Sequence, residues 1–240
     1  MTAVATNAVL AFDTACDACS AAVWRNGAIL AREFVPMARG QSEALVPMIE
    51  RVMAAAKLDF PDLAGLSVTV GPGAFTGLRI GLAAARAIAL ASGKPAVGII
   101  TLEAIAEAVP PQPGMLIVAI DAKRDDLYVQ SFAGGAAWTP SSVAIAQLPE
   151  AVTLPPGAFA LAGDGAARLY AALDDEARER ASLITDFTLP DAAVVARLAA
   201  ARLASGTVIV SPRPLYLRPP DAKLPQDGGR IRVAPMKNGA

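Results

Sequence analysis

LAFDTACDACSAAVW at residues 10–24 aligns without gaps with VAIDAKRDDLYVQSF at residues 118–132, and this internal similarity is the strongest indication of the fold. In each stretch a continuous apolar run ends in an aspartate, Asp13 or Asp121, which is typical of a buried strand. Each stretch also closes on an aromatic residue. The two aspartates are therefore predicted to hold the same position in two copies of one structural unit.

A second pair of segments repeats further along each half. An apolar run enters Gly71-Pro72-Gly73 in the first half and Gly163-Asp164-Gly165 in the second, and a helical pattern follows each. Apolar strands often end in aspartate and Gly-x-Gly turns are frequent, so either match alone could be coincidence. Two matches in the same order favour an internal duplication.

The first half has the pattern of an antiparallel meander followed by alternating helices and strands. Asn26-Gly27 separates two strand patterns and predicts a type I′ hairpin, because both residues tolerate positive φ. Pro110, Pro111 and Pro113 then mark the predicted domain boundary. We predict strands at 8–12, 19–24, 28–35, 66–70 and 96–100, and helices at 42–57, 76–92 and 102–109.

The second half repeats this plan with strands at 116–122, 127–132 and 158–162 and helices from 166 and over 191–205. A βββαβαβα unit used twice is the duplicated ribonuclease-H-like fold of actins, sugar kinases and Hsp70, the ASKHA architecture. We expect an α/β protein with one such domain at 1–110 and a second at 111–218, which ends in a short extended piece. Residues 219–240 are rich in Pro and Gly and are expected to form a disordered tail.

The overall composition excludes several classes of protein. The net charge of -1 creates no global field that would recruit nucleic acid or an anionic membrane. The apolar share is 54% but the aromatic share is only 5%, so much of the apolar content is alanine. No apolar stretch long enough for a membrane span, and no secretory signal, is apparent. Two cysteines cannot frame a disulfide scaffold, and a cytoplasmic protein is expected.

The sequence contains no histidine. A Ser-His-Asp triad, a Cys-His pair and a zincin motif are therefore all excluded. Cys16 and Cys19 have C-x-x-C spacing, but zinc would need two more soft or nitrogen ligands, so we interpret them as small, partly buried residues. No catalytic residue and no metal site are predicted.

A nucleotide site is the main alternative. Gly71-Pro72-Gly73 before a helix could present backbone N–H groups to an anion, although it is no Walker A loop. Asp13 and Asp121 could hold Mg²⁺ through water, or could simply bond their own turns. Lys123-Arg124-Asp125-Asp126 makes the second loop bulky and charged, which weakens this interpretation. The possible contacts would be Asp13, Thr14, Gly71, Gly73, Thr76 and Arg79.

The helix at 76–92 is apolar on nearly every side and must be covered on every side. Small residues recur in it at four-residue spacing, which would admit another helix. Neighbouring helices of the same domain could cover it, but a partner's helices are the favoured interpretation. The predicted interface comprises Leu45, Met48, Ile49, Val52, Gly77, Ile80, Gly81, Ala84, Ala85 and Ile88.

At these segments the chain resembles the TsaB (YeaZ) family of the tRNA threonylcarbamoyladenosine machinery. The resemblance covers most of residues 8–218, and GPGAFTGLR is its most specific element. It is also carried by LAFDTACDACSAAVW, by Gln41-Ser42 before LVPMIE, and by GPGAFTGLRIGLAAARAIAL, KPAVGIITLEAIA, AIDAKRDDLY and PLYLR. The resemblance implies a degenerate paralogue of TsaD, the catalytic subunit. Thr101 and Ile105 stand where TsaD-like chains carry a His-x-x-x-His metal motif.

The resemblance therefore implies a non-catalytic scaffold that pairs with TsaD through two N-terminal helices, the ATPase TsaE joining in bacteria. The complex transfers threonylcarbamoyl from its adenylate to the adenosine beside the anticodon of ANN-decoding tRNAs. It also implies a homodimer in isolation and tRNA contact only through the complex. Whether ATP or ADP binds at a composite surface stays open, and the chain alone is expected to hold no cofactor. The alternative from another class is an independent ATP/Mg-dependent kinase of the actin-like fold, and a third is a metallopeptidase of the related fold.

Overall fold

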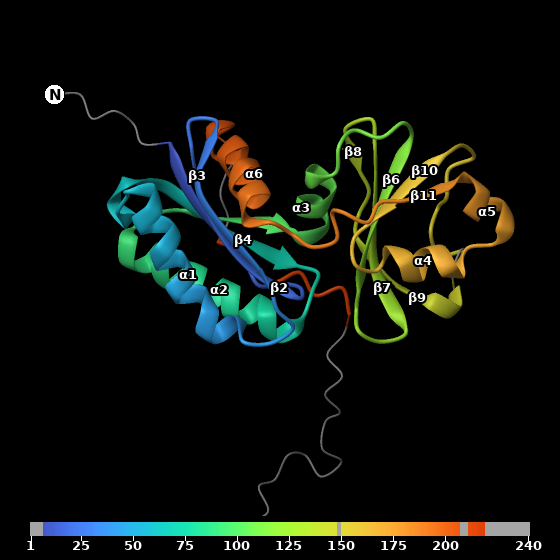
Figure 1. Ribbon diagram of the computed structural model, residues 1–240, viewed down its shortest axis with the longest axis horizontal. Helices are drawn as coiled ribbons and strands as arrows, with labels where there is room; N and C mark the ends of the chain where they lie inside the picture. The colour runs from blue at the N-terminus through green and yellow to red at the C-terminus, as the bar shows by residue number, and fades with distance from the viewer. Residues whose placement is uncertain (1–6, 148–149, 207–210, 219–240) are drawn as a thin grey trace, which may run out of the picture.

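The computed structural model describes residues 7–147, 150–206 and 211–218, so the predicted tail at 219–240 lies outside the described residues. Within them the chain forms two sheets with helices packed on their faces, arranged side by side (Figure 1). The duplicated ribonuclease-H-like fold is confirmed.

The first sheet has the strand order β3-β2-β1-β4-β5. Its central strand β1 (Ala8–Asp13) is buried throughout and pairs antiparallel with β2 (Ala18–Arg25) and parallel with β4 (Leu63–Gly71). The turn between β2 and β3 (Ala28–Pro36) has φ 50° at Asn26 and φ 89° at Gly27, as the hairpin prediction requires. On the other side, β5 (Ala96–Ile100) pairs parallel with β4.

Helices cover both faces of this sheet. The helices α1 (Gln41–Ala56) and α2 (Phe75–Ser92) lie together on one face (Figure 1). Gly93, with φ 67°, caps the C-terminal end of α2. The helix α3 (Thr101–Ala108) follows β5, and the 3₁₀ turn η1 (Phe60–Asp62) precedes β4. A core cluster between the sheet and α1 and α2 includes Phe12, Leu45, Met48 and Leu66.

The second sheet repeats the plan with the order β11-β10-β6-β7-β8. Here β6 (Met115–Asp121) pairs antiparallel with β7 (Asp126–Ala133) and parallel with β10 (Phe159–Ala162), as β1 does with β2 and β4. Asp13 and Asp121 thus end equivalent strands. The short strands β8 (Ala136–Ala137) and β9 (Ser141–Ala144) both pair with β7.

The second half departs from the predicted unit at two places. Where α1 would recur, the described residues hold only the 3₁₀ turn η2 (Ile145–Gln147), and Pro155-Pro156-Gly157 before β10 disfavours a helix there. The helix α4 (Ala166–Ala172) is followed by a second short helix, α5 (Asp175–Arg180), and by β11 (Ala181–Leu183). A three-residue strand carries too little periodicity to be predicted.

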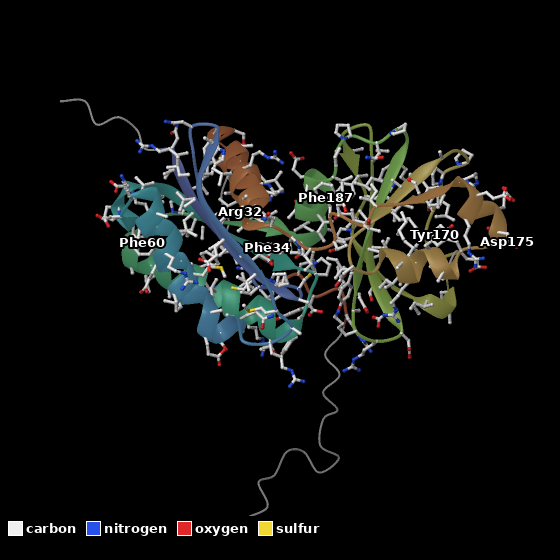
Figure 2. The ribbon with its side chains drawn as sticks, in the orientation of Figure 1. Arg32, Phe34, Phe60, Tyr170, Asp175 and Phe187 are labelled. Carbon is white, nitrogen blue, oxygen red and sulfur yellow. The ribbon has the colours of Figure 1, made fainter. Side chains whose placement is uncertain are left out.

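The helix α6 (Ala192–Ala204) packs on the first sheet, although its sequence position assigned it to the second half. Its alanines approach β1 and β5 closely, in a cluster that includes Val9, Ala11, Ala196 and Ala199. At its start, Arg32, labelled in Figure 2, forms an ion pair of 2.6 Å with the N-cap residue Asp191. The division at residue 110 stays a prediction, and α6 shows that contacts in space cross it.

A separate apolar cluster joins the two halves. It includes Ala15 and Leu78 from the first half, Val118 and Ile120 from β6, and Leu102 of α3. The halves therefore share buried surface beneath the loops that follow β1 and β6.

Candidate functional site

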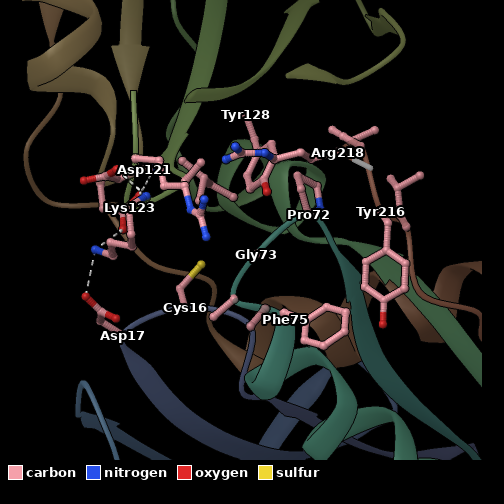
Figure 3. Close-up of a pocket in the computed structure, with 18 of the residues that line it drawn as sticks. Cys16, Asp17, Pro72, Gly73, Phe75, Asp121, Lys123, Tyr128, Tyr216 and Arg218 are labelled. Carbon is pink, nitrogen blue, oxygen red and sulfur yellow. Dashed lines mark hydrogen bonds and ion pairs between the residues drawn. The ribbon is translucent and has the colours of Figure 1, made fainter. Parts of the chain in front are cut away.

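A cleft of about 690 Å³ lies between the two halves above this shared core (Figure 3). Segments from both halves line it: the loop after β1, Pro72 and Gly73, the first turns of α2, the loop after β6, Tyr128 of β7, Asp164, and residues 215–218. Apolar and aromatic groups such as Phe75, Tyr128 and Tyr216 make up much of its wall. Because apolar walls and several charged groups meet in it, the cleft is a candidate small-molecule site.

Asp13, the strand-end aspartate of the first half, is fully buried and does not line the cleft. Its Oδ1 accepts hydrogen bonds from Thr69 Oγ1 at 2.5 Å and from the Ala15 N–H at 3.2 Å. Its Oδ2 has no partner among the described residues. Burial raises the pKa of Asp13 to about 7, against the lowering effect of the Thr69 and Ala15 bonds. This carboxyl group belongs to the core.

The loop after β1 occupies the start of α2. Ala74 N–H donates to the Ala15 carbonyl at 2.7 Å, and Thr14 Oγ1 donates to the Gly77 carbonyl at 2.7 Å. A Cβ on Gly73 would lie 2.4 Å from that same Ala15 oxygen. The glycines of this motif therefore let two segments of the chain pack closely, and the protein's own carbonyl takes an N–H that an anion would use.

The predicted nucleotide contacts are consequently not brought together at the cleft. Gly73 and Arg79 line it. Asp13 and Thr14 are buried beneath it, and neither Gly71 nor Thr76 is part of its wall. At Gly71 a Cβ would lie 2.7 Å from the Leu215 carbonyl, so this glycine admits residues 215–218 rather than a ligand.

The loop after β6 carries charges that are paired within the protein (Figure 3). Lys123 Nζ lies 2.9 Å from Asp17 of the first half and 3.7 Å from Asp164. Asp121 Oδ1 accepts from the Lys123 N–H at 2.7 Å and pairs with Arg168 at 2.5 Å. Burial raises the pKa of Asp164, which also accepts a bond from the Asp121 N–H.

The ion pair between Lys123 and Asp17 was not predicted, because it joins the two halves and depends on how they are arranged. Its only sequence signal was the alignment of the two hairpin loops, which placed Asp17 and Lys123 in equivalent loops. Asp164 appeared in the predicted Gly-x-Gly repeat without a role. Nothing in the sequence pattern singled out Arg168 as a partner of Asp121.

The predicted partner interface needs a correction. Leu45, Met48, Ile49 and Val52 are at most 3% exposed and pack beneath α1 in the core of the first half. Gly77, Gly81 and Ala85 are also buried, and a Cβ on Gly81 would lie 2.8 Å from Thr14 Oγ1. The small-residue groove therefore accepts the chain's own loop after β1. Ile80, Ala84 and Ile88 are partly buried against the same core.

The outward face of α2 is nonetheless mostly apolar, with Thr76, Arg79 and Arg86 as its exposed polar residues. Only Gly77, Leu78, Gly81, Leu82 and Ala85 are buried among its 18 residues. Leu90 is 88% exposed and Phe75 51% exposed, with the exposed residues Ala83, Ala87 and Ala91 along the same helix, and Val46 of α1 is 53% exposed. Contrary to the expectation from the sequence, α2 is long and apolar enough to cross a membrane, by length and composition only, and it is the one such helix among the described residues. We call Val46, Phe75, Ala83, Ala87, Leu90 and Ala91 the outer face.

Thr101 and Ile105, which replace the metal-binding histidines implied by the resemblance, are fully buried in α3. Ile105 belongs to the cluster that joins the two halves. Cys16 and Cys19 are both free and buried, more fully than expected. Within residues 7–147, 150–206 and 211–218, no group of three His, Cys, Asp or Glu residues could hold a metal ion.

Comparison with known proteins gives these features a family. The family model for "TsaD: tRNA N6-adenosine threonylcarbamoyltransferase" matches residues 34–223. The tRNA threonylcarbamoyladenosine biosynthesis protein TsaB of Escherichia coli is 34% identical over 123 residues, which is 50% of this chain and 52% of that protein. The tRNA N6-adenosine threonylcarbamoyltransferase of Erythrobacter litoralis is 48% identical over 66 residues, 28% of this chain and 19% of that protein.

A solved structure agrees in fold. YeaZ from Pseudomonas aeruginosa has a TM-score of 0.75 at 23% identity, covering 88% of this chain and 99% of that one. The sequence match with the Escherichia coli relative spans about half of that protein's length. The chain's curated relatives include TsaB proteins, and its fold is that of YeaZ. By the family model the chain belongs to the TsaD family.

Proposed function

We propose that this chain is a non-catalytic subunit of the machinery that makes tRNA threonylcarbamoyladenosine, and that it acts in the cytoplasm by pairing with a TsaD-like catalytic subunit. The outer face carries the pairing, and in isolation a second copy of the chain takes the partner's place. A TsaE-like ATPase joins the complex, and tRNA is contacted only through it. No membrane is involved.

The observation that carries the proposal is the exposed apolar surface of α2. Single apolar residues are normal on a protein surface. A mostly apolar helix with only 5 of its 18 residues buried is unusual and is typical of a surface that a partner covers. Exposed alanines leave the helix backbone accessible, so another helix can approach closely. Val46 extends the surface onto α1, which contacts α2. A partner's matching pair of helices would cover both.

The absence of catalysis in this chain is supported by its residues. No histidine is available to act as a base or metal ligand. Thr101 and Ile105 offer only a hydroxyl group and a hydrocarbon side chain, both inside the core, and these cannot replace imidazole ligands. The charged groups around the cleft are already paired within the protein. Lys123 pairs with Asp17 and Asp164, and Asp121 pairs with Arg168 and donates its N–H to Asp164.

An independent actin-like kinase is less well supported. Such an enzyme needs a strand-end carboxylate that reaches hydrated Mg²⁺ in the cleft. Asp13 is fully buried and its loop fills the start of α2. Calorimetry of the isolated chain with Mg-ATP should therefore give no binding. Micromolar affinity that is lost in Asp13→Asn would favour the kinase instead.

Pairing is tested by placing a charge on the outer face. Ala87→Glu should abolish co-purification with the TsaD-like subunit of the same organism, because a carboxylate would be buried in an apolar contact. Ala201→Glu is the matched control, since Ala201 is an exposed alanine of a helix on the opposite face of the same sheet. If Ala87→Glu still binds at the stoichiometry of Ala201→Glu, the outer face is not the interface.

A further inference from the structure

Residues 212–218, which we call the strap, run from the first half to the second across the cleft. The strap is fixed to the first sheet by a bond from the Leu215 N–H to the Val70 carbonyl at 2.7 Å. Arg86 of α2 donates to the Pro212 carbonyl at 2.9 Å, and Pro212 is buried. This end of the strap is therefore part of the first half.

The middle of the strap meets the first turns of α2. Arg79 Nε donates to the Tyr216 hydroxyl at 3.3 Å, and the Arg79 guanidinium lies 3.7 Å from the centre of the Phe75 ring. The rings of Phe75 and Tyr216 are 5.4 Å apart. Figure 3 shows both rings at one end of the cleft wall. Since Phe75 is 51% and Tyr216 45% exposed, the strap borders the outer face.

The far end of the strap is bound to the second half. Arg218 Nη1 lies 3.1 Å from Asp126 Oδ1 at the start of β7, and Asp126 Oδ2 accepts from Ser142 of β9. Lys123 and Asp17 form a further ion pair between the two halves. Partly exposed ion pairs of this kind are weak, so these contacts can break and re-form while the shared apolar core stays intact.

We propose that the strap is a latch that couples occupancy of the outer face to closure of the cleft. A partner that covers Phe75 and Arg79 holds Tyr216 in place, and the strap then keeps Arg218 on Asp126. When neither a partner nor a second copy covers the outer face, the strap end is released more often, and the cleft opens. The coupling rests on the proposed docking function, whereas the latch itself acts in the isolated chain.

Cys16 reports on the opening. It lines the cleft but is only 7% exposed, and burial raises the pKa of its thiol, so the closed state reacts slowly with thiol reagents. The chain has two cysteines, and the other, Cys19, has no exposed surface. Cys19→Ala leaves Cys16 as the single thiol, and mass spectrometry of the labelled chain then gives its rate of modification.

The first measurement uses the isolated chain on this background. Arg218→Gln and Asp126→Asn, which break the same pair from opposite sides, should each speed modification of Cys16 about fivefold, as expected for loss of about 1 kcal/mol. In the double variant the two effects should be clearly less than additive, because both substitutions remove the same ion pair. Arg213→Gln, an exposed residue of the same strap with the same change of charge, is the control. Equal rates for Arg218→Gln and Arg213→Gln would overturn the latch.

The second measurement adds a saturating TsaD-like subunit, with complex formation checked by light scattering. Cys16 should react more slowly in the complex than in the free chain diluted until light scattering shows a monomer, since a second copy on the outer face would act as the partner does. Arg218→Gln should remove most of this protection. A complex that forms without changing the rate overturns the coupling but leaves the docking function intact. If no complex forms, the docking function itself fails, while the first measurement still decides the latch.

Discussion

Replacing Asp13 with asparagine should make the stability of the fold less dependent on pH. In the folded chain the pKa of Asp13 is raised by burial from its ordinary value of 3.8 to about 7. The folded state therefore holds this proton more tightly than the unfolded state between those two values. By linkage, stability falls as pH rises through that window and stays lowered above it.

The size of the effect follows from 1.36 kcal/mol per pH unit. The interval between 3.8 and about 7 corresponds to about 4 kcal/mol of destabilisation at alkaline pH, of which about 3 kcal/mol develops between pH 5 and pH 8. In Asp13→Asn the new side chain keeps an oxygen to accept from Thr69 and Ala15. Its amide nitrogen takes the place of Oδ2, which has no partner among the described residues, at a cost of about 1–3 kcal/mol that does not change with pH.

Urea unfolding of both proteins at pH 5, 6, 7 and 8 measures this directly. Other titrating groups cancel in the difference between the two curves, because both proteins contain them. The Asp13→Asn variant should gain about 3 kcal/mol relative to the parent between pH 5 and pH 8. A constant difference across this range would contradict the raised pKa of Asp13 in the folded chain.

Three further pairs of substitutions test the packing around α2. Gly77→Ala should lower the free energy of unfolding by about 1–3 kcal/mol or more, because its Cβ would lie 2.0 Å from the Thr14 carbonyl oxygen. The control Gly93→Ala, in open space at φ 67°, should cost about 1 kcal/mol. Similar costs for both in urea unfolding would contradict the close approach of Gly77 to Thr14. Thr14→Val should cost about 1 kcal/mol by removing the donor to Gly77, and Thr14→Ser should restore most of it in the same assay. Gly81→Glu should unfold the chain, whereas Ala87→Glu should leave its thermal unfolding unchanged, since only Gly81 faces the core. A folded Gly81→Glu protein would restore the original interface prediction.

Local signals in the sequence were sufficient for most of the fold. The strand ending at Asp13, the Asn26-Gly27 turn and the helix ending at Gly93 are each defined by neighbouring residues, and their positions were predicted within a few residues. The duplication was visible because β1 and β6 both end in aspartate and both lead into a paired strand.

Contacts between distant residues could not be predicted in this way. Gly77 and Gly81 were expected to admit a partner's helix, but the loop that fills them is more than 60 residues earlier in the chain. The same limit applies to α6, whose apolar stripe does not reveal which sheet it covers. The strap looked like a short extended piece, and its bonds to Val70 and Asp126 depend on how the halves are arranged.

Whether the chain works as a partner of another subunit is decided by its mass in solution, measured by light scattering for the chain alone and after mixing with the TsaD-like subunit. An apolar outer face that needs cover predicts a dimer of the 24.5 kDa chain on its own and a one-to-one complex in the mixture. A chain that stays monomeric in both samples would contradict the claim that it works as a partner of another subunit.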